Sequence, residues 1–203
     1  MADIIVAGNT SGAITISAPL VAGSGTLTLP VATDTLVGKA TTDTLTNKSI
    51  AATQLTGTIA ASALPAGSVL QVVNATYATN VTNSTSTFVD TGLTASITPK
   101  FATSKILVLV DQGGAGKSGA TRIMLNLLRG ASIIQVLDVG VGGFTNSVAY
   151  NNIGSMTIAY LDSPATTSST TYKTQFGSYS NVATVTVQGD GSASSITLME
   201  IAV

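Results

Sequence analysis

Residues 32–49 consist of two nine-residue units placed back to back, Ala32-Thr-Asp-Thr-Leu-Val-Gly-Lys-Ala40 and Thr41-Thr-Asp-Thr-Leu-Thr-Asn-Lys-Ser49. Both units contain Thr-Asp-Thr-Leu, and Gly38 or Asn47 follows two positions after the leucine. Glycine and asparagine adopt a left-handed backbone more readily than other residues. Each unit is therefore predicted to be a short extended segment that ends in a turn.

The leucines of this repeat continue beyond its second unit. They are Leu36, Leu45, Leu55 and Leu64. One leucine per unit is too little apolar surface to build a core within a single chain, so the repeat must bury its leucines against a partner. The simplest partner is another copy of the chain. We therefore predict an oligomeric shaft over residues 32–67, with these four leucines along its axis.

The composition excludes several classes of protein. The 203-residue chain is 44% hydrophobic but only 8% charged, with a net charge of -1 and no Cys, His or Trp. No basic field indicates nucleic-acid binding. The absence of cysteine excludes disulfides and zinc–thiolate sites, and the absence of histidine excludes histidine-dependent triads. No apolar run approaches the roughly 20 residues of a membrane span, and no secretory signal is visible at the N-terminus.

The segments on either side of the shaft both favour β structure. Residues 1–31 contain short strand candidates at 4–6, 12–17 and 26–29, and are predicted to dock on a larger assembly. Residues 68–203 are predicted to form one β domain, because Thr, Val and Ile suit a pleated surface. The predicted strands of this domain are residues 69–73, 85–90, 93–98, 105–111, 121–129, 132–139, 156–160, 172–176, 182–187 and 195–203.

Three details of the β domain follow from local patterns. Residues 105–111 are apolar on both faces, which predicts a central strand. Thr91-Gly92 is predicted to separate two strands, and Gly189-Asp-Gly191 to join the last two as a hairpin. Short strands at this spacing predict an all-β sandwich resembling a jelly roll.

The motif Gly113-Gly-Ala-Gly-Lys-Ser118 partly matches a phosphate-binding loop. Its last three residues fit the pattern, but Asp111 occupies the position of the first glycine, where a carboxylate would repel phosphate. Ile123, Leu125 and Leu127 alternate at a period of two, which does not favour the helix that such a loop requires. The alternative interpretation is a glycine-rich hairpin loop.

Other side chains with potential chemistry show no decisive pattern. A glycosidase needs two carboxylates at a defined separation, and no sequence spacing marks a pair among Asp111, Asp138, Asp162, Asp190 and Glu200. Three tyrosines are candidates for contacting a receptor glycan or for simple packing at strand ends: Tyr77, Tyr150 and Tyr179. The sequence therefore predicts a protein without catalytic, cofactor-binding or metal-binding residues.

Several motifs together resemble bacteriophage fibre proteins, and they cover most of the chain. The N-terminal and shaft motifs are Ser11-Gly-Ala-Ile-Thr-Ile-Ser17, Gly25-Thr-Leu-Thr-Leu-Pro30 and Thr42-Asp-Thr-Leu-Thr-Asn-Lys48. The motifs leading into the C-terminal knob are Gln54-Leu-Thr-Gly-Thr-Ile59, Leu64-Pro-Ala-Gly-Ser-Val-Leu-Gln-Val-Val73 and Phe88-Val-Asp-Thr-Gly-Leu93. The knob motifs are Ser104-Lys-Ile-Leu-Val-Leu-Val110, Leu127-Leu-Arg-Gly130 and Tyr160-Leu-Asp-Ser-Pro-Ala-Thr-Thr167.

This resemblance implies a homotrimer in a virion, with no catalytic residues and no cofactor. Residues 1–31 would attach to other virion proteins, residues 32–67 would form a threefold shaft, and residues 68–203 would form the β-sandwich knob. The expected function is adhesion to a host surface glycan or protein, as a tail or head fibre. The alternative is a capsid-decorating head fibre or cement protein without receptor binding. Neither possibility involves nucleic acid or membrane insertion.

Overall fold

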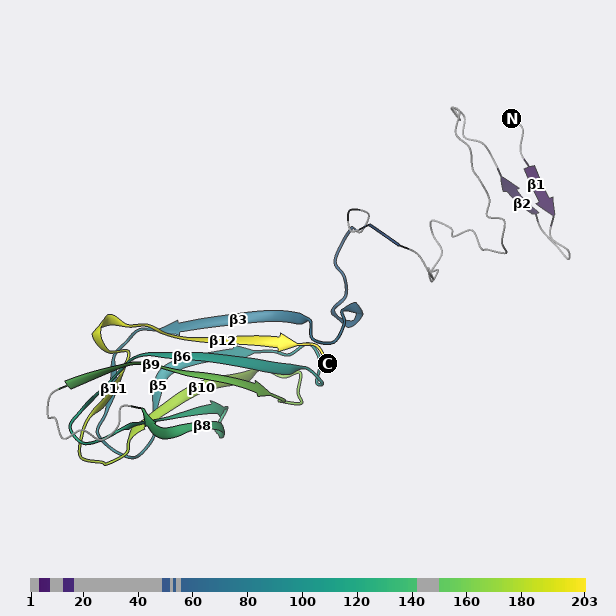
Figure 1. Ribbon diagram of the computed structural model, residues 1–203. Helices are drawn as coiled ribbons and strands as arrows, with labels where there is room; N and C mark the ends of the chain where they lie inside the picture. Colours follow the sequence, from purple (N-terminus) through teal and green to yellow (C-terminus); the bar gives the residue numbers. More distant parts are fainter. Residues whose placement is uncertain (1–3, 8–12, 17–48, 52, 54–55, 142–149) are drawn as a thin grey trace. The chain divides into compact units, whose positions relative to one another are not determined.

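A computed structural model describes residues 4–7, 13–16, 49–51, 53, 56–141 and 150–203 (Figure 1). The chain divides into two compact units, Met1–Thr56 and Gly57–Val203. In the first unit, β1 (Ile4–Ala7) pairs antiparallel with β2 (Ala13–Ile16). Both strands fall on predicted strand segments, whereas the predicted strand at 26–29 lies outside the described residues.

The second unit begins with an extended segment that leads into the β domain. A 3₁₀ turn, η2 (Ala61–Ala63), precedes Pro65. The backbone N–H of Gly67 then donates to the carbonyl of Ala202 (2.8 Å), and the N–H of Ala202 donates to the carbonyl of Ser68 (2.9 Å). The chain therefore enters the β domain beside its own C-terminus.

Two antiparallel sheets make up the β domain, as the all-β prediction required. The smaller sheet has the order β5-β10-β7-β8, formed by β5 (Val89–Ile97), β10 (Thr170–Ser178), β7 (Ile123–Arg129) and β8 (Ser132–Val141). The larger sheet consists of β3 (Val69–Tyr77), β4 (Val81–Asn83), β6 (Lys105–Ser118), β9 (Tyr150–Asp162), β11 (Val185–Val187) and β12 (Ser194–Ile201).

The larger sheet is organised around β6, the longest strand. One edge of β6 pairs with β9 along most of its length. The other edge pairs first with β12, over Lys105 to Asp111, and then with β11, at Gly116 and Lys117. The predicted central strand at 105–111 is thus confirmed, and it continues to Ser118. β3 extends the sheet beyond β12, and β4 extends it beyond β11.

Side chains that alternate along the strands fill the space between the sheets. On β6, Ile106, Val108 and Val110 are buried while the residues between them are not, which is the pattern of a strand with one face on the core. The same alternation on β9 and β10 buries Met156 and Ile158, and Tyr172, Thr174 and Phe176. Other members of this core are Leu93, Ile97, Ile123, Leu125, Leu127, Ile196 and Leu198.

The prediction that Thr91-Gly92 separates two strands is wrong. β5 runs through both residues, and its register against β10 shifts between Lys173 and Gln175. Gly92 has φ +86°, and a Cβ added there would lie 2.2 Å from the ring of Tyr77. The glycine therefore marks a bulge over which a tyrosine packs, because pairing with β10 continues on both sides of it.

The predicted hairpin through Gly189-Asp-Gly191 is also wrong. These residues form a 3₁₀ turn, η3 (Gly189–Gly191), but β11 pairs with β4 and β6, and β12 pairs with β3 and β6. The turn instead connects β11, which pairs with β6 at Gly116 and Lys117, to β12, which pairs with the same edge of β6 over Lys105 to Asp111. The 14-residue length of β6 makes this possible, because one long edge accommodates two short strands in succession. In contrast, the predicted break between β7 and β8 is confirmed at Gly130, with φ +58°.

Candidate self-association face and distal cavity

The outer face of the larger sheet carries an apolar row that crosses four strands. The registers place Val72 on β3 opposite Met199 on β12, Met199 opposite Leu107 on β6, and Leu107 opposite Leu161 on β9. Because their neighbours Ile106, Val108, Leu198 and Glu200 are buried in the domain, Leu107 and Met199 point away from the core. We call these four residues, Val72, Leu107, Leu161 and Met199, the apolar row.

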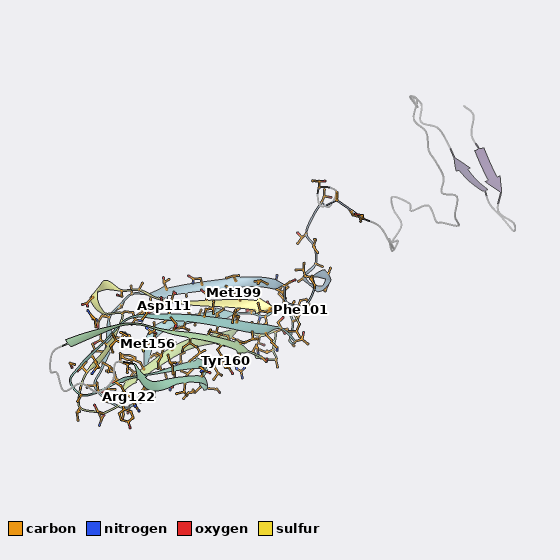
Figure 2. The ribbon with its side chains drawn as sticks, viewed as in Figure 1. Phe101, Asp111, Arg122, Met156, Tyr160 and Met199 are labelled. Carbon is orange, nitrogen blue, oxygen red and sulfur yellow. The ribbon has the colours of Figure 1, made fainter. Side chains whose placement is uncertain are left out.

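The two ends of the apolar row are exposed to solvent in the single chain, and its middle members, Leu107 and Met199, are half-buried. Val72 is 55% exposed and Leu161 is 50% exposed, and two further apolar side chains on the same face, Val69 and Leu109, are 50% and 37% exposed. Figure 2 labels Met199 and Asp111 on the strands of this sheet. Scattered exposed leucines are ordinary, but an aligned row across four strands is the kind of surface that proteins cover with a partner.

A hollow lies beside the apolar row on the same face. It has a volume of about 270 Å³ and is lined by Leu109, Val110, Asp111, Thr157, Ile158, Ala159, Ser195 and Thr197. The side chains that reach the outer face here are mostly small, whereas those of the row are large. The face thus offers both a ridge and a depression, the two complementary features that a contact between different parts of identical subunits requires.

A second cavity of about 270 Å³ lies where β6, β9 and η3 meet. It is lined by Gly114, Ala115, Asn152, Gly154, Ser155, Gly189, Asp190 and Ser192. The side-chain amide of Asn152 donates to Asp190 Oδ2 (2.8 Å), and Asp190 is exposed. We call this the distal cavity, because it lies near the end of β6 that is remote from Gly67 and Ala202.

Three of the five candidate carboxylates, Asp162, Asp190 and Glu200, are held by separate sets of partners. Asp162 accepts from Arg129 (2.9 Å) and Tyr172 (2.6 Å), while Asp190 accepts from Asn152. Asp111 is exposed on the outer face of the larger sheet, and the side chain of Asp138 lies outside the described residues. Among the described residues, no hydrogen bond links two of these carboxylates.

Glu200 has an environment that favours its ionised form. Burial alone would raise the pKa of this carboxyl, but hydrogen bonds from the Gln71 side chain and from the backbone N–H groups of Lys100 and Phe101 lower it below its ordinary value. These bonds tie the end of β12 to β3 and to the loop before β6.

Both interpretations of Gly113–Ser118 are wrong, because the whole motif lies within β6. A phosphate loop would need a strand, a turn and a helix, and the hairpin interpretation would need a reversal of the chain. Instead, Ala115 pairs with Gly154 of β9 in an irregular part of the ladder, and Lys117 pairs with Asn151. The Lys117 side chain is 1% exposed, so it is unavailable to a nucleotide.

Among the candidate tyrosines and shaft leucines, the structure places the side chains of Tyr77, Tyr179 and Leu64. Tyr77 packs against the core over the bulge at Gly92. Tyr179 is about half exposed, with the Arg122 guanidinium 3.7 Å from its ring centroid. Leu64 follows η2 and borders a small pocket with Phe101 and Val203. The side chain of Tyr150 and the residues Leu36, Leu45 and Leu55 lie outside the described residues.

A buried polar network joins the two sheets, and sequence reasoning missed it. The Ser194 hydroxyl oxygen accepts from the Gln112 side chain (2.7 Å), the Gln188 side chain (2.9 Å) and the Gly113 backbone (3.0 Å). Gln112 in turn accepts from the Thr174 hydroxyl (2.9 Å), which lies 2.6 Å from the hydroxyl of Thr91. The only sequence signal was polar residues at inward positions of otherwise apolar strands.

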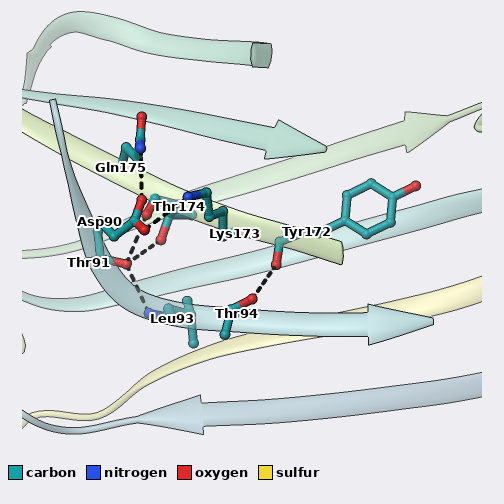
Figure 3. Close-up of polar contacts among 8 residues, drawn as sticks. All are labelled: Asp90, Thr91, Leu93, Thr94, Tyr172, Lys173, Thr174 and Gln175. Atoms are coloured by element: carbon teal, nitrogen blue, oxygen red, sulfur yellow. Dashed lines mark hydrogen bonds and ion pairs between the residues drawn. The ribbon is translucent and has the colours of Figure 1, made fainter. Parts of the chain in front are cut away.

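The contacts between β5 and β10 appear in Figure 3. The Thr91 hydroxyl reaches Thr174, and Asp90 accepts from the side chains of Lys173 (2.9 Å) and Gln175 (2.7 Å). The contact between Thr91 and Thr174 is buried, and the two contacts of Asp90 lie at the surface. Together they hold β5 against β10 around the bulge at Gly92.

Two kinds of site are absent from the part of the chain that the structure describes. The described residues contain no cluster of three or more acidic, histidine or cysteine side chains placed to hold a metal ion. Within the same part of the chain, no helix is long and apolar enough to cross a membrane.

Comparisons with known proteins do not assign the chain to a family. No protein-family model matches the sequence, and no curated protein matches it. A solved structure, described as the crystal structure of infectious bursal disease virus VP2 subviral particle, is similar to 67% of this chain at 7% sequence identity. The TM-score is 0.36, and the chain spans 38% of the length of that protein. The assignment of an all-β fold therefore rests on the strands and registers described above.

Proposed function

We propose that the protein is a structural protein of a virus particle that assembles as a homotrimeric fibre. The observation that carries this proposal is the apolar row across β3, β12, β6 and β9. An isolated domain gains nothing from leaving an aligned apolar row partly exposed, whereas full burial of an exposed apolar side chain contributes about 1.5–3 kcal/mol. Covering the row with a neighbouring copy would recover this free energy.

The sequence repeat supports a second copy as the partner. Residues 32–67 need other copies to bury Leu36, Leu45, Leu55 and Leu64, and this segment leads directly into β3 at Gly67 and Ser68. The same copies that form the shaft would thus meet again at the larger sheet. In this proposal, the ridge of each copy packs into the hollow of the next, and three such contacts close a ring.

The trimer would present three β domains on one shaft, with residues 1–31 attached to other virion proteins. Adhesion to a host surface is then the proposed function of the β domain, because three weakly binding copies on one shaft bind with avidity. A capsid-decorating role without a receptor would share the fold and the trimer, and would be distinguished by a trimer that binds no host cells.

The test uses the double variant Val72→Asp/Leu161→Asp in the full-length chain. Both side chains are already about half exposed in the single chain, so the variant is expected to fold. Losing the burial of two apolar side chains at each contact should raise the concentration at which the trimer dissociates by at least about a hundredfold. The matched control is Ser96→Asp, an exposed position on β5 of the other sheet.

Dilution series followed by light scattering or mass photometry would give these midpoints. A double variant that dissociates at the wild-type concentration would exclude the apolar row from the interface. The variant Leu45→Asp tests the shaft separately, and is expected to dissociate or unfold it. If Leu45→Asp remains a stable trimer, the axial position of the leucine is wrong.

A further inference from the structure

We infer that the distal cavity binds a neutral sugar through its hydroxyl groups, with Asp190 as the principal acceptor. This inference rests on the proposed function, since it locates the adhesion site and names the chemistry of its ligand. Four observations support it: the position of the cavity, its hydrogen-bonding groups, its glycine-lined wall and the absence of basic side chains among its lining residues.

The cavity lies far from the point where the chain enters the domain. Lys105 at the start of β6 pairs with Ile201, which is next to Ala202 and its hydrogen bonds to Gly67 and Ser68. Gly114 and Ala115 line the cavity towards the other end of the same strand. A strand rises about 3.3 Å per residue, so the cavity is roughly 30 Å from the entry point. On a shaft-mounted domain this is the end that meets a target surface.

The cavity has spare hydrogen-bonding capacity. An ionised carboxylate accepts about four hydrogen bonds, and among the described residues Asp190 receives one, from Asn152. That bond also orients the Asn152 amide, whose oxygen is a further acceptor. The hydroxyls of Ser155 and Ser192 line the same cavity and can both donate and accept. Adjacent hydroxyls of a sugar ring donate readily to a carboxylate and accept from such groups.

The wall formed by β9 leaves room for a ligand close to the backbone. Gly154 has φ +106°, and a Cβ added there would meet no atom within 4 Å. It lies opposite Ala115 at the point where the register between β6 and β9 shifts. Bulges of this kind are frequent next to binding sites. The small side chains around Gly154 therefore give a shallow, polar site large enough for one sugar ring.

The residues that line the cavity also exclude other classes of ligand. None of the eight lining residues is Lys or Arg, so a phosphate or a sugar carboxylate would meet Asp190 without a compensating positive charge. None is aromatic, so stacking contributes nothing, and hydrogen bonds must supply the affinity. A single sugar is therefore expected to bind weakly, and adhesion would depend on the three copies acting together.

The experiment measures saturation-transfer NMR on the full-length protein with three probes: methyl α-mannopyranoside, methyl α-glucopyranoside and methyl β-galactopyranoside. The variant Asp190→Asn keeps the size of the side chain and suits the left-handed backbone at this position, φ +52°. Ser155→Tyr fills the cavity from an exposed position. The matched control is Asp90→Asn, which removes a surface carboxylate on the other sheet.

The wild-type protein is expected to transfer saturation to the ring protons of at least one glycoside. Asp190→Asn and Ser155→Tyr should each weaken that binding at least tenfold, and Asp90→Asn should leave it unchanged. Two results would overturn the inference: transfer to none of the glycosides, or binding that survives both cavity variants. Light scattering on the same samples keeps the two proposals separate, because a trimer that binds no glycoside contradicts only the sugar site.

Discussion

Asp162 on β9 accepts a 2.6 Å hydrogen bond from the hydroxyl of Tyr172 on β10, and this contact joins the larger sheet to the smaller one. Arg129 on β7 donates to the same carboxylate at 2.9 Å. Burial raises the pKa of Tyr172, and the hydrogen bond with Asp162 raises it further, so the phenol remains a donor at all ordinary pH values.

Replacing Asp162 with alanine is expected to destabilise the domain by about 3 kcal/mol, because the buried Tyr172 hydroxyl loses its acceptor and the partly exposed Arg129 loses its charged partner. Tyr172→Phe removes a single hydrogen bond and should cost about 1–2 kcal/mol. Urea denaturation at one fixed protein concentration measures both values. The exposed pair Lys173–Asp90 is the control, and Lys173→Ala should cost no more than about 1 kcal/mol. Equal effects at the two sites would refute this role for Asp162.

Ser194 provides a second test of the contacts between sheets. Its hydroxyl oxygen accepts from Gln112, Gln188 and the backbone of Gly113, so Ser194→Ala would leave three buried donors without their acceptor. Each unsatisfied group costs about 1–3 kcal/mol, and relaxation of the two glutamines reduces the sum, so a loss of about 3 kcal/mol is expected. Ser96→Ala, at an exposed position, should change stability by less than about 0.5 kcal/mol. A Ser194→Ala variant as stable as Ser96→Ala would contradict the network.

The bulge at Gly92 predicts unequal effects of the same substitution at two glycines. Gly92→Ala combines a backbone at φ +86° with a clash against the Tyr77 ring, so a loss of about 2–4 kcal/mol is expected. Gly130→Ala, at φ +58° with open space around it, should cost only about 1–2 kcal/mol. Thermal unfolding of the two variants side by side would compare these effects. The packing of Tyr77 over the bulge would be refuted by a Gly92→Ala variant no less stable than Gly130→Ala.

The lowered pKa of Glu200 predicts that the stability of the folded domain depends on pH in the acid range. Its pKa in the folded protein is lower than the ordinary value of 4.5, so the unfolded chain binds a proton more readily. The stability that Glu200 contributes is therefore fully present above about pH 4.5 and is lost as the pH falls through the folded pKa. Glu200→Gln should be less stable than the wild type at pH 7, with the difference shrinking towards pH 3. A difference that stays constant over this range would contradict the prediction.

The fold class was predictable because short-range patterns determine it. Alternation at Met156 and Ile158, or at Tyr172 and Phe176, fixes which face of a strand is buried, and all four side chains are buried in the structure. The Gly130 turn was equally local, since β7 and β8 are neighbours both in sequence and in the sheet. Such features need no knowledge of distant residues.

The errors arose where partners distant in sequence decide the structure. Gly92 and the glycines of residues 113–118 look like turn signals, but pairing with β10, β9 and β11 keeps each segment extended. The Gly189–Gly191 turn was recognised, but the strands it connects were assigned to each other instead of to β6. The apolar row was equally invisible, because its four members come from four strands that only the register aligns.

The measurement that tests the central claim most directly is the solution mass of the full-length protein by light scattering. We expect a mass three times that of the 20.2 kDa chain, stable on dilution in the wild type and in Ser96→Asp. In Val72→Asp/Leu161→Asp, the dissociation midpoint should shift to a concentration at least about a hundredfold higher. A wild-type protein that is monomeric throughout the dilution series would contradict the trimer, the shared axis of the shaft and the covering of the apolar row together.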